Sequence, residues 1–222
     1  MKYFAIIFDM DGTIINTEGI WEKATQEFIA KRHGAITPEQ KKTILEKTHG
    51  LHLKASCAVI KETLGLNDDV ESIIHELSTM ANNAYVQGVT FIEGFETFHA
   101  SLEPHNLKTG LATNAHDSTV SITKKTHNLE KFFGRHIYNV SHVNNVGKPH
   151  PALYLHAAKE MGVKPEHCVV IEDSAHGIRA AKSAGMFCIG INTSKKRDNL
   201  KEADFIIDGY HEIDLKKLLK KN

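Results

Sequence analysis

Hydrophobic residues in this chain occur in short, uninterrupted runs that longer amphipathic stretches separate. The first run reads FAIIF, and the runs lie at 4–8, 107–113, 168–173, 186–192 and 204–208. A continuous apolar run of this length is typical of a strand that is covered on both faces, as in a parallel sheet. We therefore predict that each run is a buried strand of a parallel sheet.

Helical periodicity fills the intervals between the later runs. From Pro151 to Met161 the apolar residues share one helical face, and Gly162 stands where a helix cap belongs. A second helical stretch at 178–184 ends at Gly185. Because strands alternate with helices, we expect an α/β fold with a doubly wound, Rossmann-like parallel sheet.

Residues 17–88 differ from the rest of the chain, because they show helical periodicity and few strand candidates. The segment TPEQ at 37–40 is typical of a helix start, with threonine as the N-cap and proline in the first turn. We predict that 17–88 form an all-helical domain, inserted into a catalytic core that 1–16 and 89–222 make together.

Composition and charge exclude several classes of protein. The chain has 222 residues, 41% of them hydrophobic and 24% charged, with a formal net charge of zero. This balance argues against a nucleic-acid coat or a membrane-surface protein, and no apolar run approaches the roughly 20 residues of a membrane span. The cysteines Cys57, Cys168 and Cys188 are far apart, which fits a reduced cytosolic protein. We expect a cytoplasmic monomer that binds a small molecule.

Polar residues stand where these strands end, or just before the helix at 151: Asp9, Asp11, Thr113, Asn114, Lys148, Glu172 and Asp173. Because the carboxyl ends of parallel strands meet at one edge, we expect these side chains to converge. Four acids beside one lysine require a cation or raised pKa values, and oxygen ligands suit Mg²⁺. Thr113 and Lys148 are donors of the kind that hold phosphoryl oxygens.

The spacing of the first two acids suggests a division of labour. A carboxylate can attack phosphorus and form an aspartyl-phosphate, and a second carboxylate two residues later can protonate the leaving oxygen and then activate water. Each residue alone also has an ordinary role, since a DG pair is common in turns and a lysine is common at the surface. Their coincidence at several strand ends favours an active site.

Four segments, FDMDGT, LATNA, GKPHP and VVIEDSAHGIRAAKSAGM, occur in the order of the motifs of the haloacid dehalogenase-like superfamily. The chain resembles this family from Phe4 to about Ile207. The helical insertion resembles the family's subclass I cap, and the pattern is most similar to the β-phosphoglucomutase-like and sugar-phosphatase branch. The resemblance implies a Rossmann-like core, Mg²⁺ as the cofactor and a phosphomonoester as the substrate.

The resemblance also implies roles for the residues of the motifs. Asp9 resembles the nucleophile, which is also a Mg²⁺ ligand, and Asp11 resembles the general acid and base, whose backbone carbonyl binds the metal. Asp173 resembles the carboxylate ligand of the metal, with Glu172 as a further ligand or its neighbour. The phosphoryl group would be held by Thr113, Asn114 and Lys148.

The resemblance predicts a Mg²⁺-dependent phosphatase that acts on a small phosphomonoester, such as a sugar or polyol phosphate. The alternative is a hexose phosphate phosphomutase. The family's β-phosphoglucomutases carry a His and an Arg in the cap where this chain has Trp21 and Leu53.

Two other interpretations are less favoured. A haloacid dehalogenase would need neither Asp11 nor magnesium. A non-catalytic phosphate-binding regulator would be favoured if Asp9 or Asp11 were missing, and both are present.

Substrate choice is expected to depend on the inserted helical domain. Trp21 is a candidate for stacking on a sugar face, and His49 and His52 are candidates for hydrogen bonds to hydroxyl groups. The alternatives are that Trp21 packs in the core of the helical domain and that the two histidines belong to a solvent-exposed loop.

Overall fold

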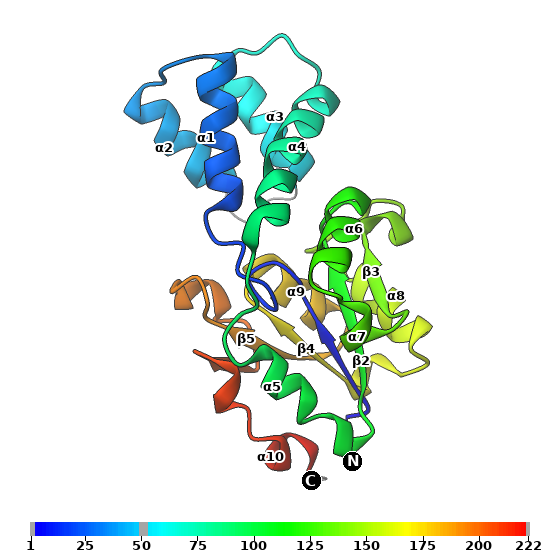
Figure 1. Cartoon of the computed structure of the whole chain (residues 1–222). Coiled ribbons are helices and arrows are strands. Elements are labelled where there is room, and N and C mark those ends of the chain that lie inside the picture. The colour runs from blue at the N-terminus through cyan, green and yellow to red at the C-terminus, as the bar shows by residue number, and fades with distance from the viewer. Residues whose placement is uncertain (1–2, 49–52, 221–222) are drawn as a thin grey trace. The chain divides into compact units, whose positions relative to one another are not determined.

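The computed structural model describes residues 3–48 and 53–220 of the chain (Figure 1). Contacts along the chain divide it into two compact units, one made of Met1–Asn16 with Val89–Asn222 and the other of Thr17–Gly88. Each unit has its own buried residues.

The unit at Thr17–Gly88 is helical. Its helices are α1 (Ile20–Arg32), α2 (Pro38–Thr48), α3 (Leu53–Leu64) and α4 (Val70–Gly88). The predicted start of α2 is confirmed, because the Gln40 amide donates to Thr37 Oγ1 at 3.1 Å and the Thr37 amide donates to Gln40 Oε1 at 2.9 Å. This reciprocal pair satisfies backbone donors at the helix start. The buried side chains of the unit include Phe28, Ile60 and Tyr85.

Among the described residues, the unit that contains both chain ends holds a six-stranded parallel sheet, in the order β3-β2-β1-β4-β5-β6. The strands are β1 (Ala5–Phe8), β2 (Lys108–Thr113), β3 (Ile137–Asn139), β4 (Cys168–Glu172), β5 (Phe187–Ile191) and β6 (Phe205–Ile207). Phe8, near the end of β1, pairs with Leu111 and Ile171 of its two neighbours. The carboxyl ends of β1, β2 and β4 therefore lie side by side, where the strand order reverses and such sheets bind ligands.

Helices cover both faces of this sheet. Ala5 and Ile7 of β1 belong to a buried cluster with residues of α8 (Ala152–Glu160) and α9 (Ala175–Ser183). Phe8 points to the other face, where its ring meets Phe95 of α5 (Phe95–Ala100) and Phe133 of α7 (Glu130–Phe133). Side chains of a strand alternate between faces in this way. The predicted doubly wound α/β fold is thus confirmed.

The remaining elements lie between the strands along the chain or follow the last strand. They are α6 (Asp117–Thr126), α10 (Leu215–Leu219) and the 3-10 turns η1 (Glu103–His105), η2 (Val140–Val143), η3 (Pro165–His167), η4 (Arg197–Leu200) and η5 (Tyr210–Glu212). η2 packs against α8 and β3, and η5 packs against α5.

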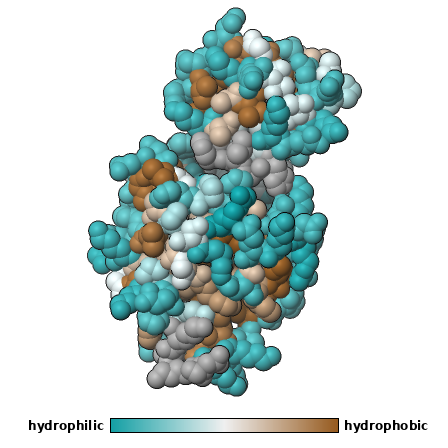
Figure 2. All heavy atoms as spheres, turned by 180° about the vertical axis from the view of Figure 1, so that it is seen from behind, coloured by the Kyte–Doolittle hydropathy of each residue, from teal (hydrophilic) through white to brown (hydrophobic). Residues whose placement is uncertain are grey.

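Hydrophobic side chains on the surface are scattered. Large exposed ones include Phe4, Val86 and Phe205, which lie in different parts of the chain. On the face drawn in Figure 2, hydrophobic residues form separate groups among hydrophilic ones. Within the described part of the chain, no helix combines the length and the apolar character that crossing a membrane requires.

Candidate active site

The first strand delivers Asp9 to the carboxyl edge of the sheet. β1 ends at Phe8, and the Asp9 amide still donates to Ile171 of β4 at 3.0 Å, so Asp9 is held in line with the strand. The chain then turns through Asp11 and Gly12. Gly12 has a φ of 78°, and a Cβ there would lie 2.3 Å from Asp173 Oδ2, so only glycine fits this turn. The DG pair thus brings the loop against the acid that follows β4.

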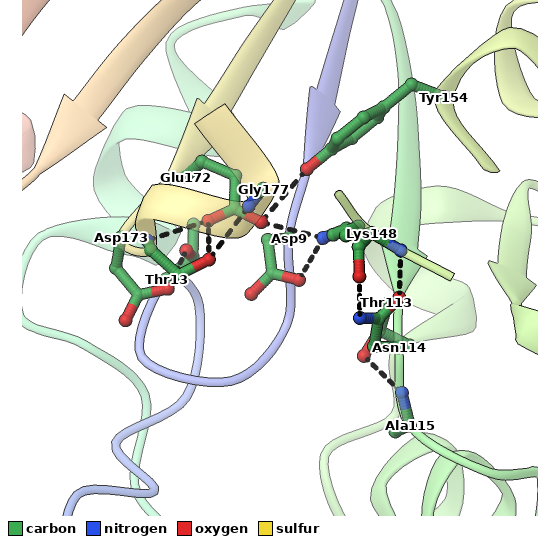
Figure 3. Close-up of polar contacts among 11 residues, drawn as sticks. Asp9, Thr13, Thr113, Asn114, Ala115, Lys148, Tyr154, Glu172, Asp173 and Gly177 are labelled. Atoms are coloured by element: carbon green, nitrogen blue, oxygen red, sulfur yellow. Dashed lines mark hydrogen bonds and ion pairs between the residues drawn. The ribbon is translucent and has the colours of Figure 1, made fainter. Parts of the chain in front are cut away.

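Lys148 connects two of the predicted acids. Its Nζ lies 2.5 Å from Asp9 Oδ1 and 2.8 Å from Glu172 Oε1, and the side chain is only 3% exposed (Figure 3). Burial acts to lower the pKa of Lys148, but the charges and hydrogen bonds of Asp9 and Glu172 raise it above its usual value. A buried ammonium group that is paired in this way stays charged.

The end of β2 supports the loop that carries this lysine. Asn114 Oδ1 accepts from the Lys148 amide at 2.9 Å, and Asn114 Nδ2 donates to the Lys148 carbonyl at 3.3 Å. Thr113 is buried, and its Oγ1 accepts from the Ala115 amide at 3.0 Å. In this structure Asn114 therefore orients the backbone of Lys148. That Thr113 and Asn114 contact a phosphoryl group stays a prediction.

Glu172 is held by four donors. Its Oε1 accepts from Lys148 and, at 3.2 Å, from the Tyr154 hydroxyl. Its Oε2 accepts from the Ser174 amide at 2.8 Å and from Ser174 Oγ at 2.9 Å. Four donors fill the lone-pair positions of a carboxylate. The side chain is buried, so its main effect in this structure is to fix Lys148.

The first turn of α9 closes over the Glu172 carboxylate. Ser174 is the N-cap of this helix, and its Oγ accepts from the Gly177 amide at 3.0 Å. A Cβ on Gly177 would lie 1.6 Å from Glu172 Oε1, so a glycine is required there. The helix N-terminus also carries partial positive charge, which stabilises a neighbouring carboxylate.

Asp173 completes an acidic group at the same edge. Asp9, Glu172 and Asp173 each offer a carboxylate oxygen, and these oxygens lie within 4.8 Å of one another. Thr13 Oγ1 donates to Asp173 Oδ1 at 3.3 Å. In Figure 3 the Asp9 oxygen that Lys148 does not contact points to the side where Asp173 lies.

The electrostatics of this group fit a divalent cation. Burial raises the pKa of Asp9 to about 7, although Lys148 acts in the opposite direction. Burial, and then the charges of Glu172 and Asp9, raise the pKa of Asp173 well above its usual value. Three carboxylates face one ammonium group, an excess of negative charge that a divalent cation would relieve. The donors are hard oxygen atoms, which suit Mg²⁺.

Several residues of this site could not be assigned from the sequence. From the sequence, Tyr154 is recognised only as an apolar residue of the predicted helix from Pro151 to Met161. In the structure the centroid of its ring lies 4.8 Å from Lys148 Nζ. Thr13, Ser174 and Gly177 stand inside the first and fourth motifs, and that position was the signal that could have identified them.

The structure brings together Asp9, Lys148, Glu172 and Asp173, with Asn114 bonded to the lysine loop. Asp11 acts electrostatically on Asp9 and is half-buried in the same loop.

The residues that we predict to select the substrate belong to the helical unit. Trp21 is half-buried near the start of α1, and His49 and His52 lie outside the described residues.

Comparison with known proteins gives consistent results. The family model for haloacid dehalogenase-like hydrolases matches residues 6–202. The chain is 28% identical over 182 residues to a protein of Thermotoga maritima named phosphorylated carbohydrates phosphatase, with 82% of each chain covered. It is 28% identical over 200 residues to the β-phosphoglucomutase of Bacillus subtilis, covering 84% of this chain and 82% of that protein.

A solved structure shares the fold. It is the structure of a hydrolase of this superfamily, family IA, variant 3, from Entamoeba histolytica, with a TM-score of 0.82, 24% identity and 97% of both chains covered. Because the family model spans far more than half of this chain, the protein is an enzyme of the haloacid dehalogenase-like hydrolase family, as the order of its four motifs predicts.

Proposed function

We propose that this hydrolase is a Mg²⁺-dependent phosphatase, which releases inorganic phosphate from a small sugar or polyol phosphate through an aspartyl-phosphate on Asp9. The observation that carries the proposal is the buried contact of Lys148 with both Asp9 and Glu172, directly beside Asp173. A buried cation beside a buried nucleophile is what attack on a phosphate dianion requires, because it offsets the repulsion between two anions.

The first half of the reaction forms a covalent intermediate. An oxygen of the Asp9 carboxylate attacks phosphorus, and the bond between phosphorus and the leaving oxygen breaks. Asp11, in its acid form, gives its proton to that oxygen, and an alcohol departs. Lys148 and the Thr113 hydroxyl stabilise the charge on the other phosphoryl oxygens.

The second half of the reaction releases phosphate. Asp11, now a carboxylate, takes a proton from a water molecule while the water oxygen attacks phosphorus. The bond between phosphorus and the Asp9 oxygen then breaks, which restores Asp9 and frees inorganic phosphate. Glu172 keeps Lys148 in place through both steps, because its buried carboxylate binds the ammonium group at 2.8 Å.

The metal would be held by Asp9, Asp173 and the backbone carbonyl of Asp11. When bound, Mg²⁺ supplies positive charge that lowers the pKa of its carboxylate ligands and balances the phosphoryl oxygens. This effect opposes burial, which raises the pKa of Asp9 to about 7. We therefore expect the Asp9 carboxylate to be ionised at neutral pH when Mg²⁺ is bound.

A sugar or polyol phosphate is the substrate class that the relatives support. The Thermotoga maritima relative is named for phosphorylated carbohydrates, and its similarity covers most of both chains. We propose that Trp21, His49 and His52 influence the choice among such substrates. Alanine variants at these positions should change the ranking of substrates while Asp9 chemistry continues.

A phosphomutase is the second candidate, because the Bacillus subtilis relative is a β-phosphoglucomutase. In a mutase the phosphoryl group on Asp9 passes to a sugar hydroxyl and not to water. The residues Trp21 and Leu53, at the cap positions where the family's mutases have His and Arg, favour hydrolysis. Isomerisation of a hexose phosphate that requires a hexose bisphosphate would identify the mutase.

The test is a measurement of phosphate release from a panel of sugar, polyol and nucleotide phosphates, with Mg²⁺ and with EDTA. We expect release that requires Mg²⁺ and is lost in Asp9→Asn. Asp198→Asn, which changes an exposed aspartate of η4, is the matched control and should remain active. A folded wild-type protein that releases no phosphate from any compound of the panel would contradict the proposal.

A further inference from the structure

Two hydroxyl groups from the last part of the chain bind the loop that carries Asp11. Thr193, which follows β5, donates from Oγ1 to the Gly12 carbonyl at 2.7 Å. Tyr210 of η5 donates its hydroxyl to the Thr13 carbonyl at 2.9 Å. Both distances are ordinary for O–H···O hydrogen bonds. The partners are separated by 181 and 197 positions along the chain, so only the fold brings them together.

The two bonds act on successive peptide planes. The Gly12 amide donates to the Ile15 carbonyl at 2.8 Å, and this bond orients the plane that also contains the Asp11 carbonyl. Thr193 holds the next plane and Tyr210 holds the one after it. Gly12 has a φ of 78° and no Cβ, so its peptide groups would rotate at low cost if they were not anchored.

Both anchors are themselves well placed for this role. Tyr210 is 2% exposed, and its ring stacks on Phe98 with 5.2 Å between the centroids. Burial, and then the charges of Asp9 and Asp173, raise the pKa of Tyr210 well above its usual value, so the hydroxyl remains a donor. The anchored residue Thr13 in turn donates to Asp173. The loop is therefore bonded on one side to the acidic group and on the other to the C-terminal segment.

We propose that Thr193 and Tyr210 are positioning residues of the active site. Their hydroxyls hold the backbone from Asp11 to Thr13 in the conformation that presents both the Asp11 carboxylate and the Asp11 carbonyl to the reaction site. The inference rests on the proposed function, since it depends on the role of Asp11 in proton transfer and metal binding. Neither residue touches the reacting atoms.

The test uses substitutions that remove one hydroxyl and preserve shape. Thr193→Val and Tyr210→Phe each delete the hydroxyl donor, and Thr193→Ser keeps a hydroxyl donor at position 193. Two matched controls delete buried or nearly buried hydroxyls elsewhere. Thr123→Val removes a bond from Thr123 Oγ1 to the Thr119 carbonyl in α6, and Tyr138→Phe removes a contact with His136 at the sheet edge.

Hydrogen exchange of the backbone amides at 11–15 is measured first, in the full-length metal-free protein. We expect exchange about fivefold faster in Thr193→Val and Tyr210→Phe than in wild type, because one net hydrogen bond is lost in each. Thr193→Ser should restore protection, and the controls should leave these amides unchanged. Exchange at wild-type rates in both variants would overturn the proposal.

Kinetics then separate positioning from stability. In Thr193→Val and Tyr210→Phe, kcat should fall about fivefold and the half-saturating Mg²⁺ concentration should rise, while KM stays near the wild-type value. Unchanged kcat and unchanged Mg²⁺ dependence would contradict the inference even if exchange were faster. If wild type hydrolyses no phosphomonoester, the proposed function fails, but Mg²⁺ binding by calorimetry and the exchange data still decide whether the hydroxyls order this loop.

Discussion

At the scale of single residues, the site depends on close contacts around one buried carboxylate. Glu172 is bonded to Lys148, Tyr154 and Ser174 and is covered by Gly177. None of these donors can be replaced by water, because the carboxylate is buried. An unpaired buried charge costs more than an unpaired neutral group. Substitutions here should therefore affect stability as well as activity.

The substitution Gly177→Ala distinguishes the close contact between Gly177 and the Glu172 carboxylate from the effect of helix propensity on stability. Alanine is favoured over glycine in a helix by about 1 kcal/mol, so propensity alone predicts a more stable protein. The new Cβ would instead meet Glu172 Oε1 at 1.6 Å. We expect a loss of about 3 kcal/mol in the free energy of unfolding, as for overpacking in a core, measured by urea denaturation. A stabilised variant would show that the carboxylate moves aside freely.

Lys148→Met tests the charge balance of the site. The variant leaves Asp9 and Glu172 buried without their cation, and breaking a buried pair in this way costs about 3–5 kcal/mol. Without Mg²⁺ we expect a loss of this size in the free energy of unfolding, and no detectable phosphate release. Lys125→Met, at an exposed position of α6, is the control and should change stability little. Equal losses in the two variants would contradict the pairing.

At the scale of elements, strands that form long apolar runs could be predicted from the sequence, and a strand of three residues could not. Every predicted strand is present, and both predicted helices after residue 150 are present, because a buried parallel strand needs a continuous apolar run. The edge strand β3 was missed, because its residues IYN are too few to form such a run. Its Asn139 instead joins it to α6 through the Asp117 carboxylate.

The start of α6 gives a pH-dependent prediction. Asp117 accepts from Asn139 at 2.6 Å and from Ser141 at 2.9 Å, and these bonds hold the pKa of Asp117 below its usual value. A lowered folded-state pKa stabilises the fold above the unfolded pKa of about 3.9 and loses that effect as the pH falls through the folded value.

Asp117→Asn should therefore be less stable than wild type at pH 7, by less than about 1 kcal/mol because Asp117 is exposed. The difference should shrink as the pH is lowered from 5 to 3. The measurement is the urea midpoint of both proteins at each pH. A difference that stays constant over this range would mean that the carboxylate charge contributes nothing.

At the scale of the whole molecule, the helical unit is an insertion between two paired segments. The Asn16 amide donates to the Thr90 carbonyl at 2.8 Å, and the Ile92 amide donates to the Ile14 carbonyl at 2.9 Å. The chain therefore leaves and re-enters the sheet unit at neighbouring points. The aromatic core on one face of the sheet, formed by Phe8, Phe95 and Phe133, belongs entirely to this unit.

Replacement of residues 17–88 by a short Gly-Ser linker should leave a folded sheet unit. We expect a single cooperative thermal transition by circular dichroism and Mg²⁺-dependent hydrolysis of para-nitrophenyl phosphate, with discrimination among sugar phosphates lost. A short linker closes this gap at small entropic cost, because the two ends already lie together. A species without a cooperative transition would show that the sheet unit needs the helices.

The sequence predicted the acidic residues and Lys148 because each occupies a strand end or a motif, and strand ends converge in a parallel sheet. The hydroxyl contacts of Tyr154, Thr193 and Tyr210 could not be predicted in the same way. Each depends on the packing of segments far apart in the chain, and a single tyrosine or threonine carries no spacing signal. Contacts of this kind are visible only in three dimensions.

The proposed mechanism requires that Asp9 becomes covalently phosphorylated. The most direct test is to mix the Asp11→Asn variant with Mg²⁺ and para-nitrophenyl phosphate, whose leaving group departs without a proton from Asp11, then quench in acid and analyse the peptides by mass spectrometry. If Asp11 activates water as proposed, its loss slows the second half of the reaction, so the intermediate should accumulate and the peptide that contains Asp9 should gain one phosphoryl group. The opposite result would be that the wild type releases phosphate while the peptide that contains Asp9 carries no phosphoryl group at any quench time, in the variant or in the wild type. That result would contradict the proposed mechanism and indicate direct attack by water.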